Sequence, residues 1–225
     1  EGSSTAGIMV SVIVCLLPAG AWGVLSFGLP ALHVIFVSVT AAVLSELLIG
    51  FLLKRFTLGD WSAVLTGLLV GYNMPPSVPL YVPAVAAAFA IAVAKMTFGG
   101  LGHNWMNPAL AGRVFVTFSW TGLMTRWQPP RGWAVDALTA ASPLGFVKAG
   151  LLDLQGSVAG PMELLAQAGY PAAGGGAVQG FPASLLAPIA RLFPPGYGDL
   201  FIGNIPGCVG EVSALLLLAG SVFLF

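Results

Sequence analysis

The sequence predicts an all-α integral membrane protein with about six transmembrane helices, some of them broken or re-entrant. Of its 225 residues 57% are hydrophobic and only 7% are charged, whereas about a quarter of an ordinary soluble domain is charged. The apolar residues form runs of about twenty, the length that a helix needs to cross a bilayer. Eight basic and eight acidic residues cancel to a net charge of zero, which leaves no positive field for nucleic acid.

The first two predicted spans are long apolar runs. Residues 7–27 form the first, in which Pro18 is tolerated because neighbouring helices can satisfy the freed backbone groups. Residues 31–53 form the second, which contains one acid, Glu46, and stops at the Lys-Arg pair of residues 54–55. Both runs are therefore expected to be single helices.

The next apolar region is broken by proline. Residues 61–94 carry no charge, but they include Pro75, Pro76, Pro79 and Pro83. These prolines exclude one continuous helix, so we expect two spans joined by a Pro-rich crossover and closed by Lys95. Glycines within residues 99–102 predict a turn or re-entrant piece. A fifth span is expected over residues 106–123, with Arg113 inside it.

The chain therefore divides into a five-span bundle (1–123), a long outer loop (124–204) and a sixth span (205–225) that contains Glu211. The loop is rich in Pro, Gly and Gln, as extramembrane segments are. Two apolar pieces within it are expected to lie at the interface or against the bundle, namely residues 144–154 and 181–190.

Basic residues give a predicted orientation. Lys54, Arg55 and Lys95 stand at the ends of the second and fourth spans, so the positive-inside rule puts these ends and the N-terminus in the cytoplasm. Parity then places residues 124–204 outside the cell. Arg126 and Arg131 in this loop argue against the assignment, although long loops cross largely regardless of charge.

A short internal echo suggests inverted repeats. Residues 60–65 and 211–216 share an acid, a gap, Ser-Ala and an apolar run. By parity the two helices that they begin point in opposite directions, as in transporter folds built from inverted repeats. A chance match in an apolar sequence explains the echo equally well.

Few side chains could catalyse a reaction by themselves. His33 and His103 are the two imidazoles, and no HExxH, GxSxG, GxxxxGK or GxGxxG motif occurs. Cys15 and Cys208 lie in apolar stretches, so we interpret them as small core residues and expect no metal site. Enzyme chemistry by this chain's own side chains is thus not expected.

Charged groups within the spans are the stronger functional signal, because charge is costly in hydrocarbon. They are Glu46, Arg113 and Glu211. In the alternative interpretation Glu46, about two turns before Lys54, is hydrated near the interface. Arg113 would then pair with a backbone carbonyl or with an acid.

Residues 60–67, 102–109, 136–144 and 203–214 form four spaced motifs. Together, in this order, they resemble the RnfD/NqrB family, the flavin-bearing membrane subunits of Rnf complexes and of sodium-pumping NADH:quinone reductases. The likeness extends from Ile8 to the last residue, and the RnfD branch is the more similar. Members of that family continue past this point, so this chain is expected to be short at its C-terminus and its bundle incomplete.

The resemblance implies a covalent FMN. In the family an Asp-Gly-x-Ser/Thr-Gly-Ala-Thr pattern is read by a flavin transferase, and its last hydroxyl takes FMN through a phosphoester bond. The matching acceptor here is Ser142, which supplies the same hydroxyl oxygen, while both family glycines are alanines (Ala137 and Ala140). In the alternative interpretation this segment is an ordinary polar turn. The recognition positions that carry over are Asp136, Thr139 and Ala141.

Two groups of side chains near the acceptor could contact the flavin. Trp120, Trp127 and Trp133 could stack on its ring, although an aromatic belt at the outer interface explains them as well. Arg126 or Arg131 could lie near the anionic phosphate.

The predicted function is that of an electron-transfer subunit of an ion-translocating oxidoreductase complex in a bacterial or archaeal inner membrane. The resemblance implies other complex subunits as partners, including a peripheral flavoprotein, besides the flavin transferase and membrane lipid. Covalent FMN is the expected cofactor, and riboflavin is a further candidate. The alternative is a small-solute channel or transporter without a cofactor, which inverted repeats and broken helices would suit. A purely structural scaffold is less compatible with the charges inside the spans.

Overall fold

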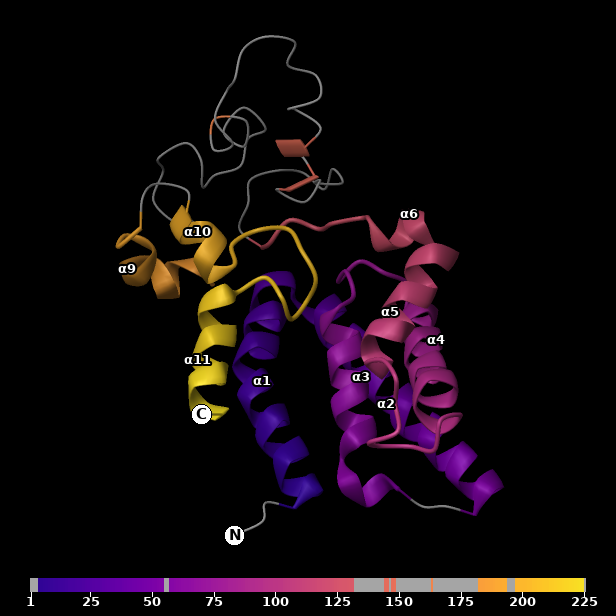
Figure 1. The fold of residues 1–225 in the computed structure, drawn as a ribbon. Coiled ribbons are helices and arrows are strands. Elements are labelled where there is room, and N and C mark those ends of the chain that lie inside the picture. Colours follow the sequence, from indigo (N-terminus) through magenta and orange to yellow (C-terminus); the bar gives the residue numbers. More distant parts are fainter. Residues whose placement is uncertain are drawn as a thin grey trace.

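The computed structural model describes residues 4–54, 57–131, 144–145, 147–148, 163, 182–193 and 197–224. Every regular element in these ranges is helical, which confirms the predicted all-α class (Figure 1). Two helices are long and apolar enough to cross a membrane. They are α1 (Thr5–Phe27) and α2 (Leu29–Leu53).

Local sequence explains where α1 and α2 begin and end. Ser4 caps α1, since its hydroxyl accepts the backbone N–H of Gly7 at 3.1 Å. Gly28 ends α1 in a conformation with φ of 80°, which only glycine adopts without strain. Pro30 stands in the first turn of α2, where its missing N–H costs nothing. The first two runs are therefore helical, as predicted, and Pro18 lies within α1.

Shorter helices follow, broken where proline and glycine predict breaks. The region 61–94 forms two helices with the crossover between them. The second continues from α-helix into a π-helical turn, a form that is rare and frequent at functional sites. Asn107 caps the helix of the predicted fifth span through the Ala109 N–H at 2.9 Å. These elements are η1 (Leu58–Asp60), α3 (Ser62–Tyr72), α4 (Tyr81–Phe89), η2 (Ala90–Met96), α5 (Pro108–Ser119) and α6 (Thr121–Met124).

The last helix starts later than the sequence predicts. Residues 205–213 are not helical, because their backbone is used elsewhere: the N–H groups of Val209 and Gly210 donate to the carbonyls of Met74 and Tyr72, each at 3.0 Å. Only from Ala214 does the chain turn helical. The elements of this part are η3 (Ala183–Leu186), α9 (Ala187–Ala190), α10 (Tyr197–Ile202) and α11 (Ala214–Leu224).

Part of the predicted loop packs against the bundle, as expected for residues 181–190. Ala183 and Ala190 form a buried cluster with Ile202 of α10, and Leu215 of α11 packs on it. Figure 1 shows α9 and α10 at the same end of the bundle as α6. The other predicted piece, residues 144–154, lies mostly outside the described residues.

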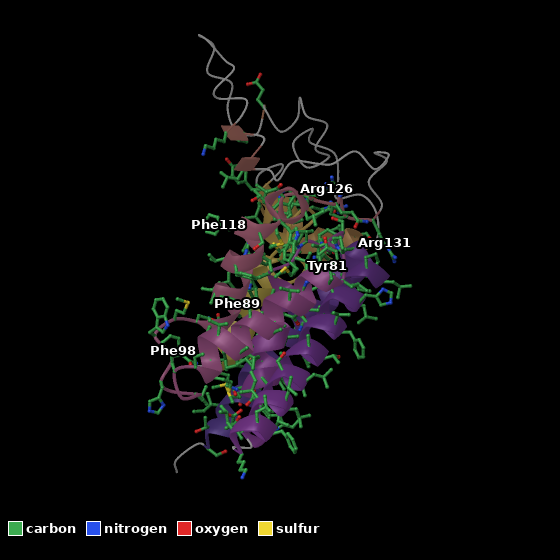
Figure 2. All side chains as sticks on the ribbon, turned by 90° about the vertical axis from the view of Figure 1, so that its right-hand side faces the viewer. Tyr81, Phe89, Phe98, Phe118, Arg126 and Arg131 are labelled. Carbon is green, nitrogen blue, oxygen red and sulfur yellow. The ribbon has the colours of Figure 1, made fainter. Side chains whose placement is uncertain are left out.

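Small side chains let the helices approach closely, and large apolar ones face outward. The main core joins α2, α3, α4 and α5 through residues such as Val34, Ala42, Ala63 and Ala86. Outer positions carry Phe51 and Phe118, which are 71% and 83% exposed, and Figure 2 shows Phe118 pointing away from the bundle. Such exposed apolar surface suits contact with lipid or with partner helices.

The helix ends divide between two faces of the bundle. Figure 1 shows the start of α1 and the end of α2 at one end and the α1–α2 turn and α6 at the other, as parity requires. The C-terminal end of α3 and the segment before α11 are joined by backbone hydrogen bonds, so α3 and α11 run in opposite directions. This agrees with the direction expected from the echo, whereas the repeat itself and the cytoplasmic side stay predictions.

Close packing of α3 on α2 gives a first testable consequence. A Cβ added at Gly67 would lie 2.6 Å from the Cα of Val39, so Gly67→Ala must push the two helices apart. We expect it to lower the free energy of unfolding by about 1–3 kcal/mol, the usual cost of overpacking. Gly59→Ala is the control, because no atom lies within 4 Å of its Cβ. Thermal unfolding in detergent compares them, and equal loss in both variants would contradict the packing argument.

A candidate functional site at a buried ion pair

A buried ion pair joins α2 to the π-helical turn. Lys95 Nζ lies 2.6 Å from Glu46 Oε2, and both side chains are at most 1% exposed. The interpretation that Glu46 is hydrated near the interface is therefore wrong. Lys95 is likewise an interior residue, so the predicted orientation now depends on Lys54 and Arg55 alone.

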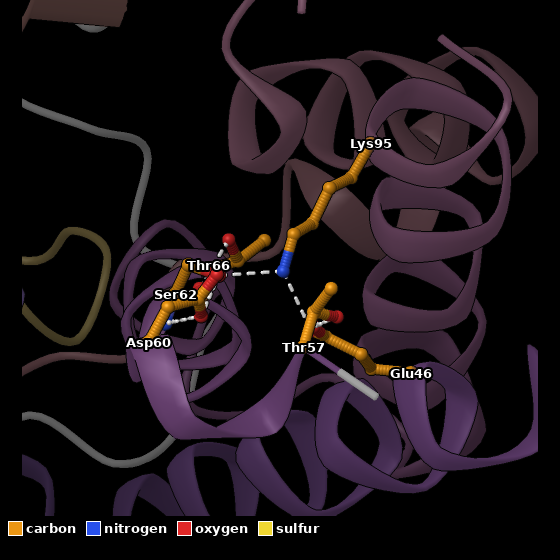
Figure 3. Close-up of polar contacts among 6 residues, drawn as sticks. All are labelled: Glu46, Thr57, Asp60, Ser62, Thr66 and Lys95. Carbon is orange, nitrogen blue, oxygen red and sulfur yellow. Dashed lines mark hydrogen bonds and ion pairs between the residues drawn. The ribbon is translucent and has the colours of Figure 1, made fainter. Parts of the chain in front are cut away.

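Hydroxyl groups complete the hydrogen bonds of this pair (Figure 3). Thr57 donates to the second carboxylate oxygen of Glu46. Lys95 also donates to Ser62 Oγ at 2.5 Å, and that hydroxyl donates to Asp60 Oδ1 at 2.5 Å. A buried ion pair needs such extra hydrogen bonds to offset the loss of hydration. These five residues are called the Glu46–Lys95 cluster below.

The backbone brings the cluster together from four segments. Asp60 also accepts the backbone N–H of Ser62 at 2.8 Å, which fixes the start of α3 beneath the pair. Trp61 between them adopts a left-handed conformation with φ of 62°. The π-helical turn of η2 carries Lys95 into the interior, where its ammonium meets α2.

A pocket of about 480 Å³ opens beside the cluster. Its lining includes Ser62 and Lys95 from the cluster, the amides of Asn104 and Asn107, and the indole of Trp105. The volume lies within the range of small-molecule sites, and the few polar groups in a mainly apolar wall are typical of them. Among the residues that line this pocket, Lys95 is the one with a charge.

A second polar cluster lies where α3 ends. Arg113 of α5 donates to Asn73 Oδ1 at 2.5 Å and to Glu211 Oε2 at 3.3 Å. Its other terminal nitrogen lies 3.7 Å from Cys208 Sγ. This confirms the expectation that Arg113 pairs with an acid. Cys208 and Cys15 are free and buried, as expected of core residues.

The predicted flavin site lies outside the described residues. That holds for Ser142 and for the recognition positions Asp136, Thr139 and Ala141, and also for Trp133. The structure does describe the residues that lead into this segment. The backbone N–H of Arg131 donates to Ser26 O at 2.8 Å, and Ser77 Oγ donates to Arg126 O at 3.1 Å.

The segment of residues 125–131, which leads into the predicted motif, is called the strap. It holds the chain against the α1–α2 turn directly before the predicted flavinylation motif, and Figure 2 shows Arg126 and Arg131 at this end of the bundle. The ring of Trp120, just before the strap, meets that of Tyr81 edge to face at 5.6 Å. Of the three tryptophans, this one thus has a partner within the bundle.

Sequence reasoning assigned Lys95 to a helix end and missed its role as the partner of Glu46. A signal was present, because parity places the last turns of the second and fourth spans at the same face of the membrane. An acid and a base at similar depth in two apolar spans are expected to pair, since either one alone would be costly.

Comparison with known proteins assigns the chain to a family. Residues 1–225 match the NQR2, RnfD, RnfE family. Two similar relatives are subunits of a Na⁺-translocating ferredoxin:NAD⁺ oxidoreductase complex, from Acetobacterium woodii, and of a proton-translocating ferredoxin:NAD⁺ oxidoreductase complex, from Clostridium ljungdahlii. Their identities to this chain are 39% and 38%, over 98% of this chain and 58% of each relative.

A third relative, a subunit of an ion-translocating oxidoreductase complex from Stutzerimonas stutzeri, is 31% identical over 99% of this chain and 60% of its own length. The chain thus spans less than two thirds of the length of these curated relatives. Because the family match covers all of its residues, the chain belongs to the NQR2, RnfD, RnfE family.

Proposed function

We propose that this chain acts as a membrane electron-transfer subunit of an ion-translocating ferredoxin:NAD⁺ oxidoreductase complex and carries FMN covalently on Ser142. The match of the whole chain to this family, with relatives named as subunits of such complexes, is the observation that carries the assignment to a complex. The proposal of FMN on Ser142 rests on the sequence motif at residues 136–142. A buried ion pair inside an apolar helix bundle agrees with a role in ion movement.

The chain's own residues would hold and orient the flavin. Ser142 offers a hydroxyl oxygen for the phosphoester, with loss of one water from FMN. The strap holds the chain before this motif, and we expect its exposed cation Arg131 to offset the negative charge of the phosphate. When bound, the isoalloxazine supplies the electron-transfer chemistry, while the protein supplies position and electrostatics.

A second flavin, riboflavin, is proposed for the pocket beside the Glu46–Lys95 cluster. The lining places polar groups of Asn104, Asn107 and Thr66 beside the aromatic face of Trp105, as a planar heterocycle would require. Asn107 Oδ1 already accepts the Ala109 N–H and the Thr66 hydroxyl donates to Ser62 O, so the Asn107 amide NH₂ and the Thr66 oxygen lone pairs are the groups proposed to face the ligand. Titration of riboflavin fluorescence with the purified protein tests this assignment. Asn107→Asp keeps the oxygen that caps α5 and removes the amide donor, so it should weaken the quenching, and unchanged quenching would exclude this pocket.

The partners and orientation follow from the same proposal. The other subunits of the complex, including a peripheral flavoprotein, would supply the NADH site and any iron–sulfur clusters, and a flavin transferase would attach the FMN. Residues 124–204 are proposed to lie outside the cytoplasm. A membrane-impermeant reagent should label a cysteine introduced at Gly175 in intact cells, and labelling only after lysis would reverse the orientation.

The covalent bond itself is tested on a denaturing gel. The wild-type band from cells that contain the transferase should fluoresce as a flavin, and the Ser142→Ala band should be dark, a complete loss. Ser142→Thr restores the hydroxyl of the family motif and should fluoresce. A fluorescent Ser142→Ala band would refute the acceptor, whereas a dark wild-type band would favour the cofactor-free channel.

A further inference from the structure

Lys95 stands between two different environments. On one side its ammonium contacts Glu46 Oε2 at 2.6 Å. On the other side it lines the pocket of about 480 Å³, together with Ser62, whereas Glu46 does not line the pocket. The residue that neutralises the carboxylate therefore borders the pocket, whereas Glu46 itself does not.

The charges of the cluster do not balance. Glu46 and Asp60 are two carboxylates, and Lys95 is the one ammonium among the five cluster residues. Asp60 faces the pair through Ser62, and Thr57 contributes an uncharged hydroxyl. Any withdrawal of Lys95 would leave Glu46 ionised and buried, a state that is strongly unfavourable unless another cation replaces the ammonium.

The backbone around Lys95 is π-helical, over Ala90–Met96. A π-helical turn contains one more residue than an α-helical turn, so its conversion to α rotates the residues that follow it. Three glycines with positive φ follow this turn, namely Gly99, Gly100 and Gly102. Such residues can absorb a rotation of η2 while α4 and α5 keep their places.

We propose that Lys95 is the coupling residue of this chain: its ammonium neutralises Glu46 in the arrangement described here, and its withdrawal into the pocket leaves Glu46 to bind one monovalent cation, H⁺ or Na⁺. The inference rests on the proposed function, because it names the residue through which ion binding is controlled. A negatively charged group that enters the pocket attracts the Lys95 ammonium and so favours its withdrawn position. Lys95 is the charged residue among those that line the pocket.

The first test removes the tethered cation. In the complex containing the full-length chain, Lys95→Met leaves the Glu46 carboxylate without its partner, so a cation from solution should bind there and stabilise the folded state. We expect its Tm to rise when Na⁺ replaces choline at constant pH, if Na⁺ is the ion. If the ion is H⁺, the Tm should rise as the pH falls in choline buffer, with no effect of Na⁺.

The matched controls are the wild type and the double variant Lys95→Met/Glu46→Gln. Neither should show this cation response, because the wild type keeps its ammonium and the double variant has no carboxylate at position 46, while Asp60 is present in every variant and cannot account for a difference between them. Lys148→Met, at an exposed position, should behave as the wild type. If the Tm of Lys95→Met changes with Na⁺ and with pH no more than the Tm of the double variant does, the proposal is overturned.

The second test uses the wild-type complex and does not depend on whether Lys95→Met assembles. After labelling with ¹³C-glutamate, dithionite is used in choline buffer to reduce the riboflavin proposed for the pocket, which adds negative charge there. The infrared band of a protonated glutamic acid should then appear, and this band should be absent from Glu46→Gln. If Na⁺ is the ion, added Na⁺ should suppress the band. A complex that transports cations during electron transfer but never shows this band would refute the role of Glu46 and Lys95, whereas failure of the wild type to transport cations would refute the proposed function instead.

Discussion

Glu46→Leu is expected to lower the free energy of unfolding by about 3–5 kcal/mol, because it leaves the Lys95 ammonium buried without its anion. Leucine has a similar size, so loss of packing is a minor part of this effect. The second change Lys95→Met should restore most of the stability, since a neutral pair of apolar side chains fills the same space. Thermal unfolding of both single variants and the double variant measures the coupling.

Glu211→Leu serves as the control for this result. Its carboxylate also pairs with a cation, Arg113, but its side chain is 47% exposed and the two atoms are 3.3 Å apart. Exposed pairs contribute about 0–1 kcal/mol, so a much smaller effect is expected. Equal losses from Glu46→Leu and Glu211→Leu would contradict the view that burial makes the Glu46–Lys95 pair special.

Gly28→Ala is expected to have the second largest effect, because it acts on both the α1–α2 turn and the strap. Gly28 has φ of 80°, and a Cβ there would lie 1.8 Å from Nη2 of Arg131. We expect a loss of about 1–3 kcal/mol from the left-handed backbone, with Arg131 displaced as well. The displaced strap should slow electron transfer in the complex while flavin fluorescence in the gel band stays at the wild-type level.

Gly100→Ala separates the two causes. Gly100 also has a positive φ, of 95°, but no atom lies within 4 Å of its added Cβ. Gly100→Ala should therefore lower the free energy of unfolding through its backbone conformation, without displacing the strap. Equal rates of electron transfer in the two variants would show that the contact between Arg131 and Gly28 does not position the flavin segment.

The sequence predicted the fold best where one local signal dominates. Apolar length identified α1 and α2, and the prolines marked the break between α3 and α4. It failed where a long-range contact decides, as in residues 205–213, whose backbone bonds to Met74 and Tyr72 delay the last helix to Ala214. No local pattern reports such a contact.

The candidate site shows the same division. Glu46 was recognisable as a costly charge within a span, but the partner depended on a π-helical turn that turns Lys95 inward. Helix propensity does not predict a π-helical turn. Such a turn shifts the helical register by one residue and persists only where packing supports it. The flavinylation motif lies outside the described residues, so Ser142 remains a prediction from the sequence.

Similarity alone does not decide which ion is moved. The relatives from Acetobacterium woodii and Clostridium ljungdahlii are 39% and 38% identical to this chain, yet the name of one specifies Na⁺ and that of the other specifies protons. The choice therefore has to come from individual side chains. The Na⁺ and pH responses of Lys95→Met bear on this question directly.

Mass spectrometry of one peptide tests the central proposal most directly. Trypsin cuts after Arg131 and Lys148, and the peptide 132–148 contains Ser142. In protein matured with its transferase, this peptide should carry the mass of FMN less one water, and its fragment ions should place the added mass on Ser142. An unmodified peptide, or the same mass on Thr139, would contradict the assignment.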